Sequence, residues 1–372
     1  MKENYKPIGD YIRVVNQKNK DLNVSQLIGL SIDKCYIPSV ANIIGTDLSN
    51  YKIIKKNQFA CSLMQVSRDG KIPIACMTEY DEAIMSPAYV IFEIIDENVV
   101  LPQYLDMWFM RSEFDREASF LAVGGVRGSL AWDDFCRMEF PLLSLSEQKE
   151  IVKAYQIIED RITLKKQIND NLLATAQTIF KSWFVDYEPF DGVCPSTWHI
   201  GSVEDIAEFY DSMRKPLSSL ERADMERLYP YYGAVSIVDY VDDYIFDGEY
   251  LLVSEDGIYV VDENGHPLIQ HISGKFWANN HAHILKGKAG FNEDSLYLFL
   301  ANTNMAPIVT GAAQPKINQA NLKSFPITIP DADVLVKFNR LIQPFFDQRL
   351  TNVSEIKELE TIKELLLSRL AG

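Results

Sequence analysis

The sequence predicts an α+β fold in which two β-rich domains alternate with two long helices, as an internal repeat with pseudo-twofold symmetry. Three observations support this prediction. Residues 144–183 form a long stretch with helical periodicity, the halves on either side of it match one another, and a second helical stretch ends the chain. We therefore predict a first domain over residues 1–143, a central helix over 144–187, a second domain over 188–330 and a terminal helix over 331–372.

The central helix has a marked start and a long apolar seam. Ser144 and Glu147 have the spacing of a capping box, in which each side chain bonds a free backbone N–H of the first turn. A helix of this length extends about 60 Å at about 1.5 Å per residue, too long for the core of one small domain. Its seam residues recur at alternating four- and three-residue steps, with Lys165 and Asn169 as a polar centre, and are otherwise Ile151, Tyr155, Ile158, Ile162, Leu172, Ala176, Ile179 and Trp183.

The terminal stretch supplies a partner helix. Its seam again contains polar residues near the middle: Phe338, Ile342, Phe345, Arg349, Asn352, Ile356, Leu359, Lys363, Leu366 and Leu370. Pro344 lacks a backbone N–H, so we expect it to kink or interrupt this helix near Gln343. We predict that the two helices pair as an antiparallel coiled coil, because a pseudo-twofold axis requires that direction.

The two halves match when one is shifted by 187 residues. This shift places residues 67–70 on residues 254–257, Gly124 on Gly311 and Arg127 on Gln314. Both halves also have similar predicted elements: a strand at 88–95 and a helix at 102–111 in the first, strands at 250–254 and 258–261, a turn at Asn264-Gly265 and a helix at 294–301 in the second. The match predicts a repeated order of domain, helix, domain, helix.

Composition places the chain among cytoplasmic globular proteins. Its 372 residues are 47% hydrophobic and include five cysteines without CxxC spacing, as in a reducing compartment. The N-terminus has no signal-peptide core, and the apolar runs are short, so we expect no membrane association.

The charge is unevenly distributed along the chain. The net charge is −16, yet residues 1–60 carry nine Lys or Arg against five Asp or Glu, a balance of +4. Residues 191–330 carry nine against nineteen, a balance of −10. Few cations release few counterions from DNA, so we expect weak binding of the isolated chain to DNA and a modest salt dependence.

We predict no catalytic residue and no metal site. The sequence contains no GxxxxGK[ST] loop, no Asn-Pro-Pro-aromatic motif and no HExxH motif. Acidic pairs such as Asp133-Asp134 are interpreted as solvated charges or helix caps. His281 and His283 alternate on a predicted strand, with His271 and His266 nearby, which could indicate a metal site. We favour polar residues on one strand face or base-reading side chains.

Several segments resemble the specificity subunits of type I restriction-modification systems. These are FPLLSLSEQKEIV and NDNLLATAQTIFKSWF around the central helix, VRGSLAWDDF in the first half, and YYGAVSIVDYVDDYIFDGEYLLVSEDG and QPKINQANLKSFPI in the second. The resemblance implies two target-recognition domains that each read one half of a split double-stranded DNA target, with the helices as a spacer. It also implies docking of two methyltransferase (modification) subunits and of restriction or translocase subunits, whose cofactors would be S-adenosylmethionine, ATP and Mg²⁺, with no cofactor in this chain.

Two alternatives stay open. One is the specificity subunit of a system that only methylates or whose nuclease is fused elsewhere. The other, from a different class, is an acidic protein-binding scaffold or DNA-mimic decoy, which the −10 balance of residues 191–330 favours.

The expected DNA contacts lie in polar and glycine-rich loops, where Lys suits phosphate, Asn and Gln suit adenine and Arg suits guanine. Arg68 could instead form a surface ion pair, and of Tyr231 and Tyr232 we expect one in the core and one facing DNA. The candidates in the first half are Lys18, Asn19, Lys20, Arg68, Lys71, Arg127 and Ser129. Those in the second half are Arg214, Lys215, Tyr231, Tyr232, Gln314, Lys316 and Asn318.

Apolar residues also lie outside the seam of the central helix. One partner helix cannot cover this much of the circumference, so either the globular domains or another subunit must pack there. The resemblance favours modification subunits, and the candidate docking residues are Ile157, Leu164, Leu173 and Phe180.

Overall fold

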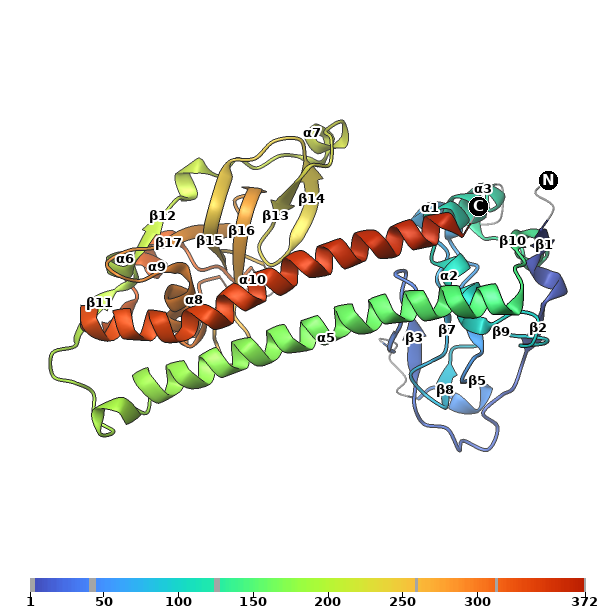
Figure 1. The fold of residues 1–372 in the computed structure, drawn as a ribbon, viewed down its shortest axis with the longest axis horizontal. Coiled ribbons are helices and arrows are strands. Elements are labelled where there is room, and N and C mark those ends of the chain that lie inside the picture. Colours follow the sequence, from blue (N-terminus) through green and yellow to red (C-terminus); the bar gives the residue numbers. More distant parts are fainter. Residues whose placement is uncertain (1–3, 40–44, 124–127, 258–259, 312–313, 371–372) are drawn as a thin grey trace. The chain divides into compact units, whose positions relative to one another are not determined.

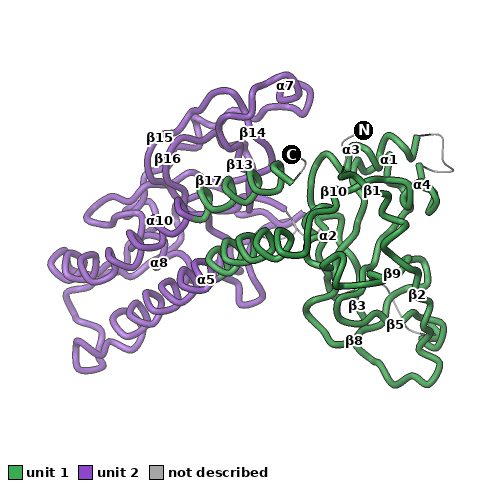
Figure 2. The backbone as a smooth tube through the Cα atoms, turned by 45° about the vertical axis from the view of Figure 1, so that its right-hand side comes forward, with its two compact units in different colours: residues 1–163, 356–372 green, residues 164–355 purple. Residues whose placement is uncertain are grey.

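The computed structural model describes residues 4–39, 45–123, 128–257, 260–311 and 314–370. The chain divides into two compact units, Met1–Thr163 with Ile356–Gly372 (unit 1) and Leu164–Glu355 (unit 2) (Figure 2). The long helices α5 (Leu145–Phe184) and α10 (Ala332–Arg369) each contribute residues to both units.

Unit 1 contains a four-stranded antiparallel sheet in the order β2-β9-β6-β7, with two-stranded sheets β1-β10, β3-β4 and β5-β8 (Figure 1). Its strands are β1 (Tyr5–Pro7), β2 (Ile12–Val15), β3 (Ile28–Leu30), β4 (Tyr36–Pro38), β5 (Lys52–Lys55), β6 (Phe59–Cys61), β7 (Ile74–Cys76), β8 (Glu82–Met85), β9 (Val90–Ile94) and β10 (Glu139–Pro141). Its short helices are α1 (Val66–Asp69), α2 (Pro102–Phe109), α3 (Ser112–Leu121) and α4 (Trp132–Arg137).

Aromatic side chains join the sheet of unit 1 to its helices. Phe59 and Phe92 stack across β6 and β9 with ring centroids 5.0 Å apart, and Phe109 of α2 meets Phe59 edge-on at 5.7 Å. Offset and edge-on pairs add to the apolar burial that drives folding. Gln148 of α5 is fully buried beside this core and donates hydrogen bonds of 2.9 Å to the carbonyls of Val99 and Leu143.

Unit 2 contains a six-stranded sheet in the order β12-β17-β15-β16-β13-β14, in which only the β13-β16 pair is parallel among the described residues, and a two-stranded sheet β11-β18 (Figure 1). Its strands are β11 (His199–Ser202), β12 (Ala207–Phe209), β13 (Tyr229–Tyr232), β14 (Ile237–Val241), β15 (Phe246–Ser254), β16 (Ile269–Ala278), β17 (Ala282–Gly287) and β18 (Pro326–Ile329). Its short helices are α6 (Val203–Ile206), α7 (Ser219–Ala223), α8 (Glu293–Ala301) and α9 (Gln319–Lys323).

The long helices run antiparallel within unit 2. Lys165 of α5 forms an ion pair of 2.6 Å with Glu355 of α10, whereas Phe180, four turns further along α5, meets Phe338 near the start of α10. Asn352 links the two helices at the polar centre of the seam, since it accepts a hydrogen bond of 3.2 Å from Lys165 and donates one of 2.8 Å to Asn169.

The start of α5 confirms the capping box. The Ser144 N–H donates to Glu147 Oε2 at 2.9 Å, and the Glu147 N–H donates to Ser144 Oγ at 3.4 Å. In unit 1 the first turns of α5 and the last turns of α10 pack on the same hydrophobic core, through the partly buried Ile151, Val152, Tyr155 and Leu366. The Lys363 ammonium lies 2.9 Å from the Glu159 carboxylate there.

α10 continues through Pro344, so of the kink or interruption that we expected near Gln343 the interruption does not occur. The exposed Pro344 lies between Ile342 and Phe346, both of which are buried in the core of unit 2. Burial of apolar residues on both sides of the proline offsets the loss of one backbone hydrogen bond.

The shorter predicted elements form with small shifts at their ends. The strand at 88–95 is β9, the strand at 250–254 lies within β15, and the helices at 102–111 and 294–301 are α2 and α8. At the Asn264-Gly265 turn, the Gly265 N–H donates to Asp262 O at 3.0 Å, and Gly265 has a φ of 83° that suits glycine. Of the strand predicted at 258–261, the first two residues lie outside the described residues.

Candidate nucleic-acid interface

Glu255 is the centre of a polar network in unit 2. It lies directly after β15, and its carboxylate oxygens bind Arg214 at 2.6 Å and Lys316 at 2.9 Å. The Ile317 N–H also donates to the Glu255 carbonyl, at 2.9 Å. The structure therefore brings together two of the predicted DNA-contacting residues, Arg214 and Lys316, which lie far apart in the sequence.

Asp211 forms the buried half of this network. Its Oδ2 lies 2.6 Å from His283 Nδ1 and accepts a hydrogen bond of 2.7 Å from Gln319, while its Oδ1 accepts the Ile284 N–H. Burial alone would raise the pKa of Asp211, but the bond to His283 and the nearby Arg214 guanidinium outweigh it and lower the pKa. The carboxylate is therefore held in its charged form.

His283 belongs to this network and has no free nitrogen. Its fully buried ring also places Nε2 2.8 Å from the Ile317 carbonyl, so both ring nitrogens face oxygen acceptors. Asp211, Glu255 and His283 are close enough to hold a metal ion. Arg214 and Lys316 already supply the positive charge there, so the arrangement fits a structural ion-pair network.

Arg214 is consequently unsuited to the base contact that we predicted. Its side chain is 14% exposed, and besides Glu255 it donates hydrogen bonds to the carbonyls of Asp211 at 3.0 Å and Ala282 at 2.7 Å. A guanidinium with all these partners would have to break buried hydrogen bonds to reach DNA.

Other cations and polar groups stay accessible around the network. The Lys316 side chain is 45% exposed although it contacts Glu255, and Lys215 and Gln314 are exposed. His281 is half exposed and lies 2.6 Å from Asp256. Lysine suits phosphate, and Gln or His suits a base edge, so this surface has the chemistry of a nucleic-acid contact.

The tyrosine pair and Asn318 play different parts. Tyr231 is buried, its hydroxyl accepts the Leu217 N–H at 2.9 Å, and the Arg222 guanidinium lies 4.8 Å from its ring centroid. Tyr231 is therefore the core member, which corrects its inclusion among the DNA contacts. Tyr232 is half-buried and packs edge-on against Phe276 at 5.6 Å. Asn318 caps α9 by accepting the Asn321 N–H at 2.8 Å.

In unit 1 the loop at residues 18–20 exposes its two lysines and buries its asparagine. Lys18 and Lys20 are exposed, whereas Asn19 is 2% exposed. The Asn19 amide donates to the Val24 carbonyl at 2.9 Å and accepts the Val24 N–H at 3.3 Å. Its predicted contact with an adenine is therefore wrong, because the side chain holds the loop in shape and has no free edge.

In unit 1 the loop at residues 67–70 lies beside the loop that contains Gly128. Gly128 is so close to Ser67 that a Cβ at this position would lie 2.3 Å from the Ser67 hydroxyl, and the Leu130 N–H donates to Leu63 O at 2.9 Å. Arg68 is 65% exposed and pairs with its neighbour Asp69 at 2.7 Å, and Lys71 is half exposed beside Asp33. Ser129 is half-buried in the same place, and Arg127 lies outside the described residues.

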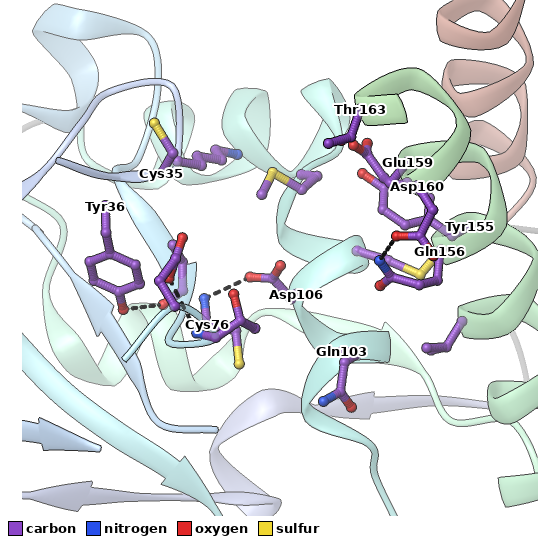
Figure 3. A pocket seen from close by; sticks show the side chains of 17 residues that line it. Cys35, Tyr36, Cys76, Gln103, Asp106, Tyr155, Gln156, Glu159, Asp160 and Thr163 are labelled. Carbon is purple, nitrogen blue, oxygen red and sulfur yellow. Dashed lines mark hydrogen bonds between the residues drawn. The ribbon is translucent and has the colours of Figure 1, made fainter. Parts of the chain in front are cut away.

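A separate hollow in unit 1 has acidic walls (Figure 3). Its volume is about 500 Å³, and it is lined by Glu79, Asp106, Glu159 and Asp160 among others. Burial raises the pKa of Asp106 to about 7, and its carboxylate accepts the Cys76 N–H at 2.9 Å. An acidic lining repels phosphate, so we do not assign DNA contacts to this hollow.

The predicted docking residues on α5 divide into two kinds. Ile157 is 57% and Leu164 is 55% exposed. Phe180 is 6% exposed and packs on Phe299 at 4.9 Å, and Leu173 is half-buried against the same core, so these two are not available for docking. Phe180 and Leu173 pack on the second domain. This is the alternative to a partner subunit that the sequence analysis left open.

Sequence reasoning missed Asp211, Glu255 and Asp256 because it searched for cations. The repeat had placed the acidic loop 254–257 on residues 67–70, and that match was the available signal for these residues.

No described helix is both long enough and apolar enough to cross a membrane.

The model of the family described as type I restriction modification DNA specificity domain matches residues 195–365. This range contains the complete polar network of unit 2. Residues 195–365 are therefore similar to this DNA specificity domain, and the resemblance of the chain to the specificity subunits of type I restriction-modification systems is confirmed.

The relatives are themselves specificity subunits. The chain is 36% identical to the putative type I restriction enzyme specificity subunit S.HindORF215P of Haemophilus influenzae over 140 residues, which are 38% of this chain and 35% of that protein. It is 24% identical to the type I restriction enzyme MjaIX specificity subunit of Methanocaldococcus jannaschii over 306 residues, 74% of this chain and 70% of that protein. The match thus spans about a third of the first relative and about two thirds of the second.

The fold is similar to a solved structure of the same class. The S subunit of a type I restriction-modification system from M. genitalium aligns with a TM-score of 0.54 and 13% identity, over 98% of this chain and 95% of that one. This likeness shows a shared arrangement of helices and strands.

Proposed function

We propose that this chain is the non-catalytic subunit that gives a type I restriction-modification complex its DNA sequence specificity. Residues 1–143 and 188–330 would each read one half of a split double-stranded target. Residues 144–187 and 331–372 would form an antiparallel coiled coil that sets the distance between the half-sites. The comparisons support this proposal because the matched family is a DNA specificity domain and both relatives are specificity subunits.

One structural observation carries the proposal of two equivalent readers. In unit 1 the loop 67–70 lies against Gly128, and in unit 2 the loop 254–257 lies against residues 315–317, since the Gly257 N–H donates to Pro315 O at 3.3 Å. The 187-residue shift relates these two loop pairs, and both are bordered by exposed cations. A repeated loop pair with cations is what a duplicated DNA reader requires.

The proposed DNA contacts are the predicted residues that the structure leaves accessible, together with Arg127. Lys18, Lys20 and Lys71 would hold phosphates in the first half, with Arg68, Arg127 and Ser129 nearer the bases. Lys215 and Lys316 would hold phosphates in the second half, with Gln314 and Tyr232 nearer the bases. Because these cations are few, affinity should come mainly from the assembled complex.

The proposed docking surface for modification subunits includes Ile157 and Leu164 on α5. Ile168 is 37% exposed and follows Leu164 by four residues, so the three lie on one face of the helix. Exposed apolar residues in register on a helix favour a protein partner. Catalysis, with S-adenosylmethionine, ATP and Mg²⁺, would belong to the methyltransferase and restriction subunits.

The test is an exchange of one recognition domain. The chain would be expressed with its cognate methyltransferase subunit, and methylated adenines would be mapped across the genome. Replacing residues 188–330 with the corresponding domain of another specificity subunit should change one half of the split motif and leave the other half intact. A change in both halves would contradict independent readers.

The acidic second half favours one other candidate, a protein-binding scaffold or DNA decoy. In that case Glu255 and its neighbours would mimic phosphates instead of supporting cations. Methylome mapping with the cognate methyltransferase subunit separates the two. A split methylated motif that is lost in Lys316→Ala supports a reader, and the absence of any methylated motif despite intact partner binding would support the scaffold or decoy.

A further inference from the structure

A second cluster of possible ligands lies in unit 2, apart from the Glu255 network. Glu249 of β15, His271 of β16 and Asp294 of α8 each offer one ligand atom, and these atoms lie within 4.8 Å of one another. In the antiparallel register of β15 and β16, Leu251 is opposite His271. Residues that are opposite one another, or two apart on one strand, point to the same face of a sheet. Glu249 and His271 therefore lie on one face.

His271 is buried in this cluster without a hydrogen-bond partner. Its side chain is 8% exposed, its Nδ1 is 3.8 Å from Asp294 Oδ1, and its Nε2 is buried with no partner. The ring lies between Tyr297, with a centroid distance of 6.2 Å, and Phe346, at 5.8 Å. The distance from His271 Nδ1 to Asp294 Oδ1 is too long for a hydrogen bond, so a cation between these two atoms would satisfy both of them.

The surroundings of the cluster contain more negative than positive charge. The carboxylates of Glu293 and Asp347 act on Asp294, and the positive groups that act on the cluster are Arg349 and Lys286. Burial and the neighbouring Glu249 carboxylate raise the pKa of Asp294 to about 7, and burial lowers the pKa of His271 to about 4. Negative charge thus outweighs positive charge around the cluster, which favours a bound cation.

The Glu255 network shows how a satisfied cluster differs. There Arg214 and Lys316 contact the carboxylates directly, and both nitrogens of His283 have partners. Asp211 and Glu255 have lowered pKa values although burial alone would raise them, because bonds to His283, Lys316 and Arg214 favour their charged forms. The two clusters have the same residue types, but among the described residues no lysine or arginine forms an ion pair with the carboxylates of the second cluster.

We propose that Glu249, His271 and Asp294 bind a divalent transition-metal ion of the Zn²⁺ class. One imidazole and two carboxylates suit such an ion, which takes nitrogen and oxygen ligands at roughly 2.0–2.2 Å. Ligands of a tetrahedral ion at these distances are about 3.3 Å apart, so the three side chains need only small rotamer changes to converge. The ion would connect β15 and β16 to the first turn of α8, as a structural site that stabilises the second domain and is independent of the proposed DNA reading.

The experiment uses the full chain, treated with chelator, dialysed and then titrated with Zn²⁺ alone. At about 100-fold above the dissociation constant, the melting temperature of the wild type should rise by about 5–10 °C. His271→Ala and Asp294→Asn should show a rise of less than about 1 °C. The control His199→Ala removes an exposed histidine on β11 and should behave as the wild type.

Asp294→Asn also tests whether the variant folds, because it keeps the shape of the side chain and removes a buried charge. Without metal it should melt at or above the wild-type temperature. Co²⁺ gives a direct readout, since visible absorption bands of a low-symmetry site should appear in the wild type and be absent from His271→Ala. Equal Zn²⁺ responses in all four proteins would show binding elsewhere, for example at the exposed Cys35 and Cys194, and would overturn the proposal, as would the absence of any response.

Discussion

Glu255 binds two cations, of which only one stays accessible. Its side chain is 11% exposed and binds Arg214 on one oxygen and Lys316 on the other. The Arg214 guanidinium is occupied by hydrogen bonds to buried groups, whereas almost half of the Lys316 side chain is exposed to solvent. The Glu255 carboxylate, which Arg214 holds in place, can therefore orient the accessible Lys316 ammonium for the proposed contact with DNA.

Glu255→Gln should destabilise the second domain and weaken DNA binding. The amide keeps one acceptor, but it removes the charge that Arg214 and Lys316 share, which should cost about 1–3 kcal/mol. Chemical denaturation of the full chain measures the change in the free energy of unfolding. The matched control is Glu263→Gln on an exposed turn, where a change below about 0.5 kcal/mol is expected. Equal effects of the two substitutions would contradict the role given to Glu255.

Asp294 gives a prediction about pH for the metal-free chain. Its folded-state pKa, raised to about 7, lies above the value of an unfolded aspartate, so ionisation above pH 7 destabilises the folded state. Asp294→Asn removes this penalty. The melting temperature of the variant should exceed that of the wild type most at pH 8, and the difference should shrink as the pH is lowered to 4. An advantage of equal size at pH 8, 6 and 4 would exclude this linkage.

At the scale of elements, the long helices combine apolar contacts with a polar centre. Ile162 and Ala176 are buried on α5, and between them Lys165 and Asn169 reach the residues of α10 near Asn352. Such a polar layer costs some stability compared with an apolar one but fixes the register of the two helices. A fixed register is what a spacer between two readers needs.

Asn352→Ala should therefore destabilise the helix pair and loosen its register. Asn352 is 2% exposed and accepts hydrogen bonds from Lys165 and Gln348 at 3.2 Å, so its loss leaves buried donors unpaired at a cost of about 1–3 kcal/mol. Thermal unfolding of the full chain is the measurement. Asn171→Ala, at an exposed position of α5, is the control and should change stability by less than about 0.5 kcal/mol. If both variants melted alike, the polar centre would have no structural role.

At the scale of the whole molecule, the proposed function depends on two readers and a spacer of defined length. The acidic balance of residues 191–330 limits what the chain can bind by charge alone, so in the proposed complex we expect the partner subunits to supply much of the affinity. Specificity can still come from this chain, because phosphate contacts position a protein and base contacts select the sequence.

A seven-residue deletion tests the spacer. Removing seven residues between Ile158 and Leu172, with a matched deletion in α10, shortens each helix by about 10 Å at about 1.5 Å per residue. The helical seam stays in phase because a heptad is removed. The unread gap in the methylated motif should shorten by about three base pairs, at about 3.4 Å per base pair. An unchanged gap in the mapped methylome would rule out the helices as the spacer.

The sequence by itself determined the features that depend on local order along the chain. The capping box at Ser144, the length of both long helices and the turn at Gly265 follow from residue type and spacing, so they were predicted correctly. The family resemblance was also readable, because it lies in contiguous segments.

Only the tertiary structure decided which polar residues are free to act. Asn19, Arg214 and Tyr231 have suitable chemistry for DNA, yet Asn19 and Tyr231 are buried and Arg214 is largely so. Their polar groups are satisfied by other residues of the chain, and for Arg214 these include Glu255 and Ala282. Phe180 has the apolar character of a docking residue but packs into the core of unit 2. The physical reason is that burial and hydrogen bonding depend on contacts between residues far apart in sequence, which periodicity and spacing do not specify.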